Sequence, residues 1–215
     1  MNFEEIKKKT EAFVKEELLT LEPWILNVKW EEKLPKLNEL RGKVKSKGLW
    51  LPQISKEYGG LGLTNAEHGE VSEILGASPY GHYCFNCQAP DAGNMEILIE
   101  FGTDKQKENY LYPLLNGEIR SCFAMTEPDY AGSNPVRMGT IATKKNNNYL
   151  INGHKWFTSG FDGATFAIVM LVTDPKASVP HQKASQVIVP TSSEGLEFVR
   201  NISIMGHPGG GWESH

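Results

Sequence analysis

The hydrophobic pattern of this chain changes near Ser121, and this change constrains the fold more than any single motif does. Before Ser121, apolar residues recur at the three- and four-residue spacing of amphipathic helices. After it, short apolar runs alternate with turn residues, which is typical of β-strands. Helices followed by strands indicate an α+β fold. We therefore predict a helical domain over residues 1–120 and a β domain over residues 121–215.

Five helices are predicted in the first part of the chain. Two of them begin at capping boxes, in which a threonine is followed three residues later by Glu67 or Gln106. Residues 58–62 contain three glycines and are predicted to form a loop. Pro113 is expected to kink or shorten the fifth helix. The predicted helices are residues 3–22, residues 34–47, a helix that opens after residue 64, residues 91–101 and residues 103–117.

The second part is predicted to contain strands joined by tight turns. The pair Asn152-Gly153 is a strong signal for a two-residue hairpin turn, with residues 149–151 and 154–158 as its strands. Alternation in residues 140–143 predicts another strand, which ends at a run of three asparagines. Three further apolar runs are predicted as strands: residues 166–172, 186–189 and 196–202.

The composition argues against several classes of protein. The formal net charge is -4 and the pI about 5.9, whereas nucleic-acid-binding proteins usually carry a basic face. No run approaches the ~20 apolar residues of a membrane span. The charged residues 1–17 lack the apolar core of a signal peptide. Three cysteines are too few for a disulfide framework, so we expect the protein in the reducing cytoplasm.

Cys84 and Cys87, with His82 close by, form a pattern that can bind a metal or act in redox chemistry. A structural zinc site needs four ligands, usually from two such pairs, and Cys122 is the one other cysteine. A thioredoxin-type motif belongs at a strand-to-helix junction of a βαβ unit, which this region does not show. We therefore expect no metal site and interpret both cysteines as small apolar residues packed between helices.

A glycine-rich segment begins at His207 and is similar to the oxyanion loop of esterases. Those enzymes also carry a Gly-x-Ser-x-Gly elbow, which Gly132-Ser133-Asn134 does not supply. Glycines alone are weak evidence for phosphate binding, because such a site also needs a helix N-terminus behind it. A surface turn is the favoured interpretation, and an esterase is a minor alternative.

Two segments thirty residues apart carry the strongest functional signal. Residues 122–134 and 151–160 each combine hydroxyls, small residues and an aromatic at the end of a predicted strand. Such a surface suits a flat heterocycle with polar edges, because hydroxyls and backbone N–H groups can stabilise negative charge that develops on it. Each segment alone is equally consistent with a turn or a core aromatic, but the two together are more specific.

Four motifs, in the same order along the chain, resemble the acyl-CoA dehydrogenase family. Residues 52–62 resemble its proline- and glycine-containing loop, residues 101–107 resemble a helix start, and residues 124–128 and 156–158 resemble its two flavin segments. Residues 85–96 further resemble the subgroup whose animal members carry a kinase-like domain fused ahead of the dehydrogenase. The resemblance implies an all-helical N-terminal domain followed by an incomplete antiparallel β-barrel domain, with the family's C-terminal helical bundle absent.

The resemblance also implies FAD as the cofactor. The isoalloxazine ring would rest against the predicted hairpin that carries Trp156, with the Thr158 hydroxyl donating toward N5 and Thr126 bonding the pyrimidine edge. Ser133 would lie near the pyrophosphate or the acyl-CoA. The residues that the resemblance assigns to cofactor binding are Phe123, Met125, Thr126, Ser133, Trp156, Phe157 and Thr158.

The chain departs from the family pattern at two points. Residues 129–134 are one residue longer than the usual Gly-x-Gly-Ser-Asp, and Asn134 replaces its acid. The family's catalytic glutamate comes later than His215 in the order of its motifs, so no catalytic residue is assigned in this chain. Glu127 does not replace it, because the motif gives Glu127 a structural role in a turn.

The implied function is that of the N-terminal part of an FAD-dependent acyl-CoA dehydrogenase, which oxidises acyl-CoA thioesters to 2-enoyl-CoA. Its expected partners are acyl-CoA, an electron-transfer flavoprotein and, in the complete protein, further copies of the same chain. Without the base, residues 1–215 alone are expected to be inactive. Two alternatives remain open: a non-catalytic flavin- or acyl-CoA-binding or scaffold module, and one half of a split enzyme.

Overall fold

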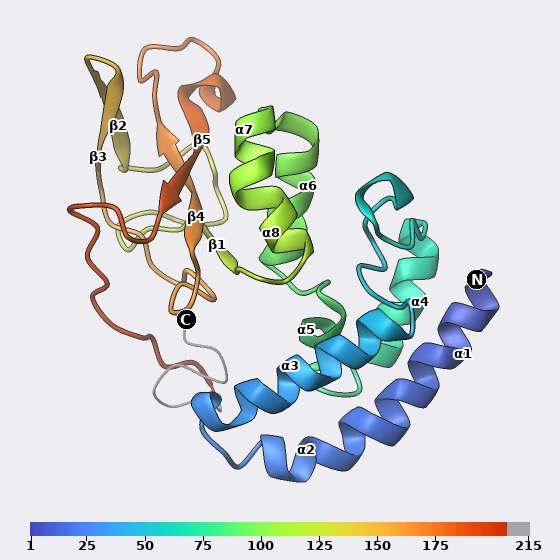
Figure 1. Cartoon of the computed structure of the whole chain (residues 1–215). Helices are drawn as coiled ribbons and strands as arrows, with labels where there is room; N and C mark the ends of the chain where they lie inside the picture. Colours follow the sequence, from blue (N-terminus) through green and yellow to red (C-terminus); the bar gives the residue numbers. More distant parts are fainter. Residues whose placement is uncertain (206–215) are drawn as a thin grey trace. The chain divides into compact units, whose positions relative to one another are not determined.

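The computed structural model describes residues 1–205 and divides into two compact units, with the division between Gly117 and Glu118 (Figure 1). The first unit is built from helices and the second from strands, which confirms the α+β class. No helix within residues 1–205 is both long and apolar enough to cross a membrane.

Two helices of the helical unit begin at the capping boxes that the sequence predicts, whereas the helix predicted to start at residue 34 begins at Trp30. The Thr64 side chain accepts from the Glu67 N–H, and the Glu67 carboxylate accepts from the Thr64 N–H. Thr103 and Gln106 make the same reciprocal pair. The helices are α1 (Phe3–Phe13), α2 (Leu19–Ile25), α3 (Trp30–Ser46), α4 (Asn65–Leu75), α5 (Gly81–Phe85), α6 (Asp91–Phe101), α7 (Asp104–Gln106) and α8 (Tyr112–Leu115).

Three further helical details differ from the prediction. The first predicted helix is divided into α1 and α2 by a π-helical turn, Val14–Leu18, and α2 passes Pro23 and ends at Ile25, because the Leu26 N–H still donates to the Glu22 carbonyl at 3.0 Å. Helix α5 was not predicted, since five residues are too few to show a helical period. The fifth predicted helix is irregular ahead of Pro113: a π-helical turn, Lys107–Leu111, separates α7 from α8.

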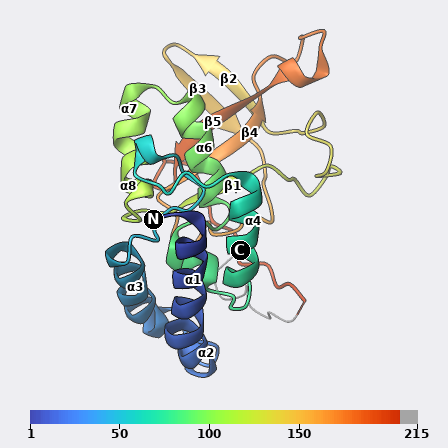
Figure 2. The same ribbon diagram turned by 90° about the vertical axis from the view of Figure 1, so that its right-hand side faces the viewer.

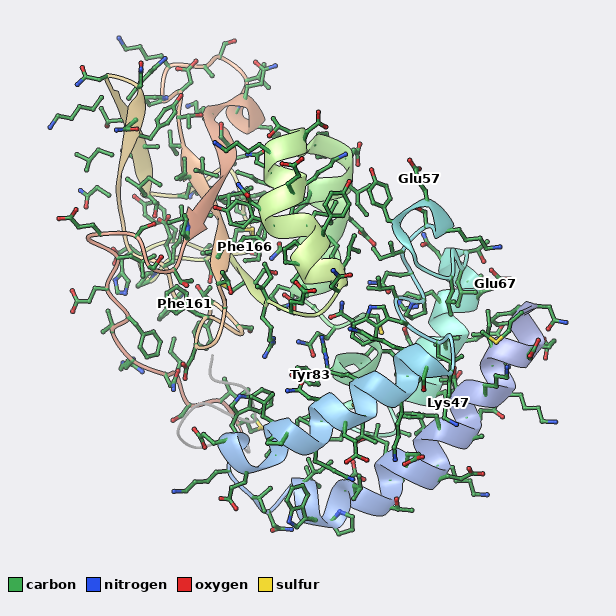
Figure 3. All side chains as sticks on the ribbon, viewed as in Figure 1. Lys47, Glu57, Glu67, Tyr83, Phe161 and Phe166 are labelled. Carbon is green, nitrogen blue, oxygen red and sulfur yellow. The ribbon has the colours of Figure 1, made fainter. Side chains whose placement is uncertain are left out.

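Buried contacts between α3 and α5 organise the helical unit. The Arg41 guanidinium donates to the Tyr83 carbonyl at 2.7 Å and to Asn86 Oδ1 at 3.2 Å. Its carbon lies 4.9 Å from the centre of the Trp50 ring and 4.6 Å from that of Tyr83, which Figure 3 labels on α5. Helix α3 lies beside α1 and α2 in both ribbon views (Figures 1 and 2). The apolar residues buried here include Phe13, Leu18, Ile25, Leu37, Leu40, Val44 and Phe85.

The second unit is a mixed, open sheet built around β4. Strand β4 pairs in parallel with β1 and, at its far end, with β2, and in antiparallel fashion with β5 along its length. Strands β2 and β3 form an antiparallel hairpin. The expected antiparallel pairing therefore holds for two pairs, while the other two run parallel. The strands are β1 (Ser121–Ala124), β2 (Ile141–Lys145), β3 (Asn148–Asn152), β4 (Phe166–Val172) and β5 (Ala184–Pro190).

The central strand β4 is apolar along its length, and both of its faces are covered. Phe166, Ala167, Ile168, Val169 and Leu171 are all buried. Cys122, Ala124 and Ala142 pack with this strand into one core cluster. The prediction of a strand over residues 166–172 is therefore confirmed.

The predicted hairpin turn at Asn152-Gly153 is wrong. The two-residue turn falls instead at Asn146-Asn147, where Lys145 pairs with Asn148 and Asn146 adopts a left-handed φ of 57°. Asparagine tolerates this conformation better than most residues do. Residues 153–158 form no strand, because backbone and side-chain hydrogen bonds hold them to residues 125–127 instead.

The strand predicted over residues 196–202 is also wrong. This segment adopts no strand, and the side chains of Phe198 and Val199 are 47% and 65% exposed. The Phe198 ring stacks on Phe161, with centroids 5.6 Å apart. Phe161 precedes Phe166, the first residue of β4, by five residues, and Figure 3 labels both. The glycine-rich segment at His207 lies outside the described residues.

Candidate functional site

The first segment of the site continues from β1 and folds back on itself. Strand β1 ends at Ala124, which pairs with Val169 in the sheet core. The chain then turns, so that Gly132 comes against the Thr126 side chain. A Cβ placed on Gly132 would lie 2.6 Å from Thr126 Cγ2, a distance that no real contact shows. Glycine is needed here because the loop returns so closely onto Thr126.

The second segment joins the first through Thr126 and Trp156. The Trp156 N–H donates to the Thr126 carbonyl at 3.1 Å, and Thr126 Oγ1 donates to the Trp156 carbonyl at 2.7 Å. The two residues are thirty positions apart, so neither bond follows from local structure. The segments that the sequence singles out therefore lie side by side and form one surface.

A buried ion pair is formed by the residues next to this junction, Glu127 and Lys155. Lys155 Nζ is 2.7 Å from Glu127 Oε1, and the two side chains are 12% and 5% exposed. Lys155 also donates to the Met125 carbonyl at 2.8 Å. The Glu127 carboxylate accepts from the Thr140 N–H at 2.9 Å and from the Gly139 N–H. The structural role expected for Glu127 thus extends to three separate stretches of chain.

These contacts decide the charge of the Glu127 carboxyl. Burial by itself would raise the pKa of Glu127, but hydrogen bonds from Lys155, Thr140 and the Gly139 N–H lower it to about 2. Burial lowers the pKa of Lys155, and the neighbouring Glu127 carboxylate opposes that shift. Glu127 is therefore an ionised, fully engaged carboxylate at neutral pH.

The surface of the second segment exposes two aromatic rings. The Trp156 and Phe157 side chains are 37% and 48% exposed, and their rings meet edge to face with centroids 5.1 Å apart. Phe157 has a φ of 50°, in the left-handed region that bulky residues rarely occupy. Backbone of this kind is concentrated at functional sites, where the surrounding contacts hold it in place.

The structure brings some of the seven predicted residues together and leaves others apart. Hydrogen bonds join Thr126 to Trp156 and the Met125 carbonyl to Lys155, and the Phe157 ring contacts the Trp156 ring. The remaining three are placed as follows: Phe123 is half-buried in β1 opposite Ile168, Ser133 is exposed beyond Gly132, and Thr158 is half-buried with its carbonyl accepting from the Phe161 N–H.

Sequence reasoning missed the partnership of Glu127 and Lys155. Each residue lies inside one of the two segments, but no local signal indicates that their side chains meet. A lysine and a glutamate on strand-end loops are ordinarily solvated, so their spacing carried no prediction. The left-handed backbone at Phe157 also had no signal in the sequence.

The other candidate residues occupy ordinary positions. Cys84 and Cys87 are buried in the helical unit, and none of the three cysteines forms a disulfide. Burial raises the pKa of Cys84 to about 12 and also raises that of Cys87. Within residues 1–205, no group of three or more His, Cys, Asp or Glu side chains is arranged to hold a metal ion.

Two family models match the chain, one over each unit. The N-terminal domain of acyl-CoA dehydrogenases matches residues 2–118, and the middle domain matches residues 122–213.

Among related proteins, acyl-CoA dehydrogenase family member 10 of Mus musculus is 44% identical over 187 residues, covering 82% of this chain and 17% of the relative. Acyl-CoA dehydrogenase family member 11 of Homo sapiens is 33% identical over 230 residues, covering 99% of this chain and 29% of the relative. The chain thus spans less than a third of the length of these two relatives.

Solved structures show the same fold. A Mycobacterium abscessus protein assigned to the acyl-CoA dehydrogenases superposes with a TM-score of 0.89 at 35% identity, covering 97% of this chain and 55% of that one. The acyl-CoA dehydrogenase from Geobacillus kaustophilus superposes with a TM-score of 0.69 at 25% identity, covering 94% and 51%. With both units matched and the Thr126–Trp156 surface formed between the two expected segments, the chain belongs to the acyl-CoA dehydrogenase family.

Proposed function

We propose that this chain supplies part of the FAD and acyl-CoA site of an FAD-dependent acyl-CoA dehydrogenase, which oxidises acyl-CoA thioesters to 2-enoyl-CoA. Residues 1–120 would form the helical domain of that enzyme and residues 121–215 the flavin-contacting part of its β domain. The observation that carries the proposal is the pair of hydrogen bonds between Thr126 and Trp156. These bonds unite the two family segments into one surface.

The chemistry of this surface fits a flavin. The exposed Trp156 and Phe157 rings offer an apolar face for a flat ring system. Thr126 Oγ1 already donates to the Trp156 carbonyl, so its lone pairs are left to accept from an N–H on the polar edge of a ligand. The Thr158 hydroxyl, two residues after Trp156, would donate to a nitrogen of the flavin ring. Phe123, Met125 and Ser133 would complete the contacts, with Ser133 toward a phosphate or the acyl-CoA.

Each part of the reaction has a distinct requirement. FAD, when bound, supplies the acceptor for the β-hydride of the substrate. The residues of this chain would orient the ring, with Trp156 and Phe157 excluding water from one side and Thr158 donating a hydrogen bond to the edge that gains electron density. Removal of the α-proton requires a general base.

Glu127 is unsuited to be that base. Its carboxylate accepts hydrogen bonds from Lys155, Thr140 and Gly139, which together with burial set its pKa to about 2. A group with so low a pKa takes up a proton poorly near neutral pH. In agreement with the order of the family's motifs, we propose that the base comes from outside residues 1–215, and that these residues alone are inactive.

The proposed partners rest on the resemblance to the family. They are an acyl-CoA substrate, an electron-transfer flavoprotein that takes up the electrons, and further copies of the chain in an oligomer. With a net charge of -4, no nucleic-acid partner is proposed. The expected location is the cytoplasm, and the three cysteines without a disulfide are consistent with a reducing compartment.

FAD binding tests the proposal. Titration of the purified protein with FAD, followed by quenching of flavin fluorescence, should show one saturable site. Trp156→Ala should weaken binding by roughly two- to twelvefold, the effect of losing an aromatic contact worth about 0.5–1.5 kcal/mol. Trp24→Ala is the matched control, because Trp24 is similarly exposed, at 43%, but lies in α2. Equal affinities of the two variants would contradict the assigned site. A stable protein that takes up no flavin would favour a scaffold module.

A further inference from the structure

The Glu127–Lys155 pair differs from the ion pairs on the surface of the chain. Its side chains are 5% and 12% exposed, whereas those of Glu70 and Lys7 in the helical unit are 49% and 33% exposed. An exposed pair contributes little to stability. A buried pair costs desolvation, and in some proteins its main effect is to specify a geometry rather than to add stability.

The contacts of the pair meet at one point of the β unit. Lys155 reaches both the Met125 carbonyl at 2.8 Å and the Glu127 carboxylate at 2.7 Å. Glu127 in turn holds the backbone N–H groups of Gly139 and Thr140, just ahead of β2. The loop after β1, the approach to β2 and the segment after β3 are therefore tied together by two side chains.

This point lies next to the junction of the two flavin segments. Thr126 sits between Met125 and Glu127, the two residues that Lys155 binds, and Trp156 follows Lys155 directly. The ion pair thus holds the backbone on both sides of the Thr126–Trp156 hydrogen bonds. Removing one charge would leave the other buried without its partner, which drives local rearrangement.

We infer that Glu127 and Lys155 are a positioning pair, which fixes the spacing of Thr126 and Trp156 and thereby the shape of the cofactor surface. A binding surface needs its contact groups held to within a fraction of an ångström by the residues behind them. The link to flavin binding rests on the function proposed above. The spacing of Thr126 and Trp156 can be measured without any cofactor.

The first experiment measures amide hydrogen exchange by NMR in the flavin-free protein. Lys155→Met keeps the apolar stem of the side chain but removes its charge and donors. The Trp156 amide, which donates to Thr126, should then exchange about tenfold faster or more, because local opening becomes easier. The amides of Ile168 and Val169 in β4 should keep their rates within about twofold.

Two further variants sharpen this comparison. Lys155→Arg retains the charge and the donors, so it should restore most of the protection of the Trp156 amide. Lys144→Met removes an exposed lysine of β2 and should leave all of these rates unchanged. Unchanged exchange at Trp156 in Lys155→Met, or an equal acceleration throughout β4, would overturn the inference. If Lys155→Met does not fold, Glu127→Gln gives the same test with the same two contradicting outcomes.

The second readout is FAD affinity. Lys155→Met and Glu127→Gln should bind FAD about tenfold more weakly than the unaltered protein, with Lys144→Met unchanged. Faster Trp156 exchange in a protein that takes up no FAD would sustain the positioning pair and reject the flavin function. Equal FAD affinity in Lys155→Met and the unaltered protein would sustain the flavin function and reject the role of the pair.

Discussion

Thr126 and Trp156 are joined by two hydrogen bonds that run in opposite directions across thirty residues of chain. The backbone carbonyl and the hydroxyl of one threonine engage both the N–H and the carbonyl of the tryptophan, at 3.1 and 2.7 Å. Both polar backbone groups of Trp156 are thus satisfied from one side, which leaves its ring on an open surface.

Gly132→Ala should disturb the junction. The added Cβ would lie 2.6 Å from Thr126 Cγ2, so either the loop or Thr126 must move. We expect a loss of roughly 1–3 kcal/mol in the free energy of unfolding, the usual cost of overpacking, measured by urea denaturation. Gly93→Ala is the control, because nothing lies within 4 Å of a Cβ at that position in α6. Because alanine is favoured over glycine inside a helix, Gly93→Ala should stabilise the protein by roughly 0.5–1 kcal/mol. An unchanged free energy of unfolding in Gly132→Ala would show that the loop yields at no cost.

Thr158→Ala should change the electronics of the bound flavin. Loss of a hydrogen bond to the reduced ring, worth roughly 1–3 kcal/mol, lowers the two-electron midpoint potential by roughly 20–65 mV. Spectroelectrochemical titration measures this shift. Ser159→Ala is the control, because it removes an exposed neighbouring hydroxyl and should leave the midpoint potential unchanged. An unchanged potential in Thr158→Ala would reject the assigned role of Thr158.

Glu127 should make part of the stability sensitive to acid. Folding lowers its pKa from the ordinary value of 4.5 to about 2, so the ionised form is favoured in the folded state. The stabilisation is complete above pH 4.5 and is lost as the pH falls toward 2. We expect about 1–3 kcal/mol, because the cost of burying Lys155 offsets part of the gain.

The measurement for Glu127 is the difference in unfolding free energy between the unaltered protein and Glu127→Gln, taken across pH 2 to 7. The difference should be constant near neutral pH and should shrink below pH 4.5. A difference that does not vary with pH would show that the charge of Glu127 contributes nothing.

Cys84 and Cys87 should be unreactive in the folded protein. Burial raises the pKa of Cys84 to about 12, and that of Cys87 also rises, so little thiolate is present at pH 8. A thiol-directed dye should label neither residue until the chain is unfolded, and elemental analysis should find no stoichiometric zinc. Cys84→Ser should still fold. Rapid labelling of the native protein, or bound zinc, would overturn the packing interpretation.

Residues 1–215 alone should show no acyl-CoA dehydrogenase turnover, even with saturating FAD. General-base catalysis typically contributes ~10²–10⁴-fold, and Glu127 is not available for it. A dye-reduction assay with a panel of acyl-CoA thioesters measures this, with a full-length relative as the positive control. Turnover near that of the relative would place a base within these residues.

Local interactions made much of the helical unit predictable. The capping boxes at Thr64 and Thr103 are formed by residues three apart, so their hydrogen bonds depend on little beyond the sequence itself. Strand β4 was equally evident, because a strand that is covered on both faces must be apolar along its length. The motif resemblance also identified the two segments that meet at Thr126 and Trp156, although the roles of the seven assigned residues remain predictions.

Only the tertiary structure decided where the chain after β3 goes. The sequence predicted the hairpin turn at Asn152-Gly153, but the hairpin turns at Asn146-Asn147, because Lys155 and Trp156 are hydrogen-bonded to residues 125–127. The same long-range bonds bury Glu127 and lower its pKa to about 2. Turns and helix ends depend on neighbouring residues, so the sequence predicts them. The contacts of residues 155–156 with residues 125–127 form only once the sheet has brought these distant segments together.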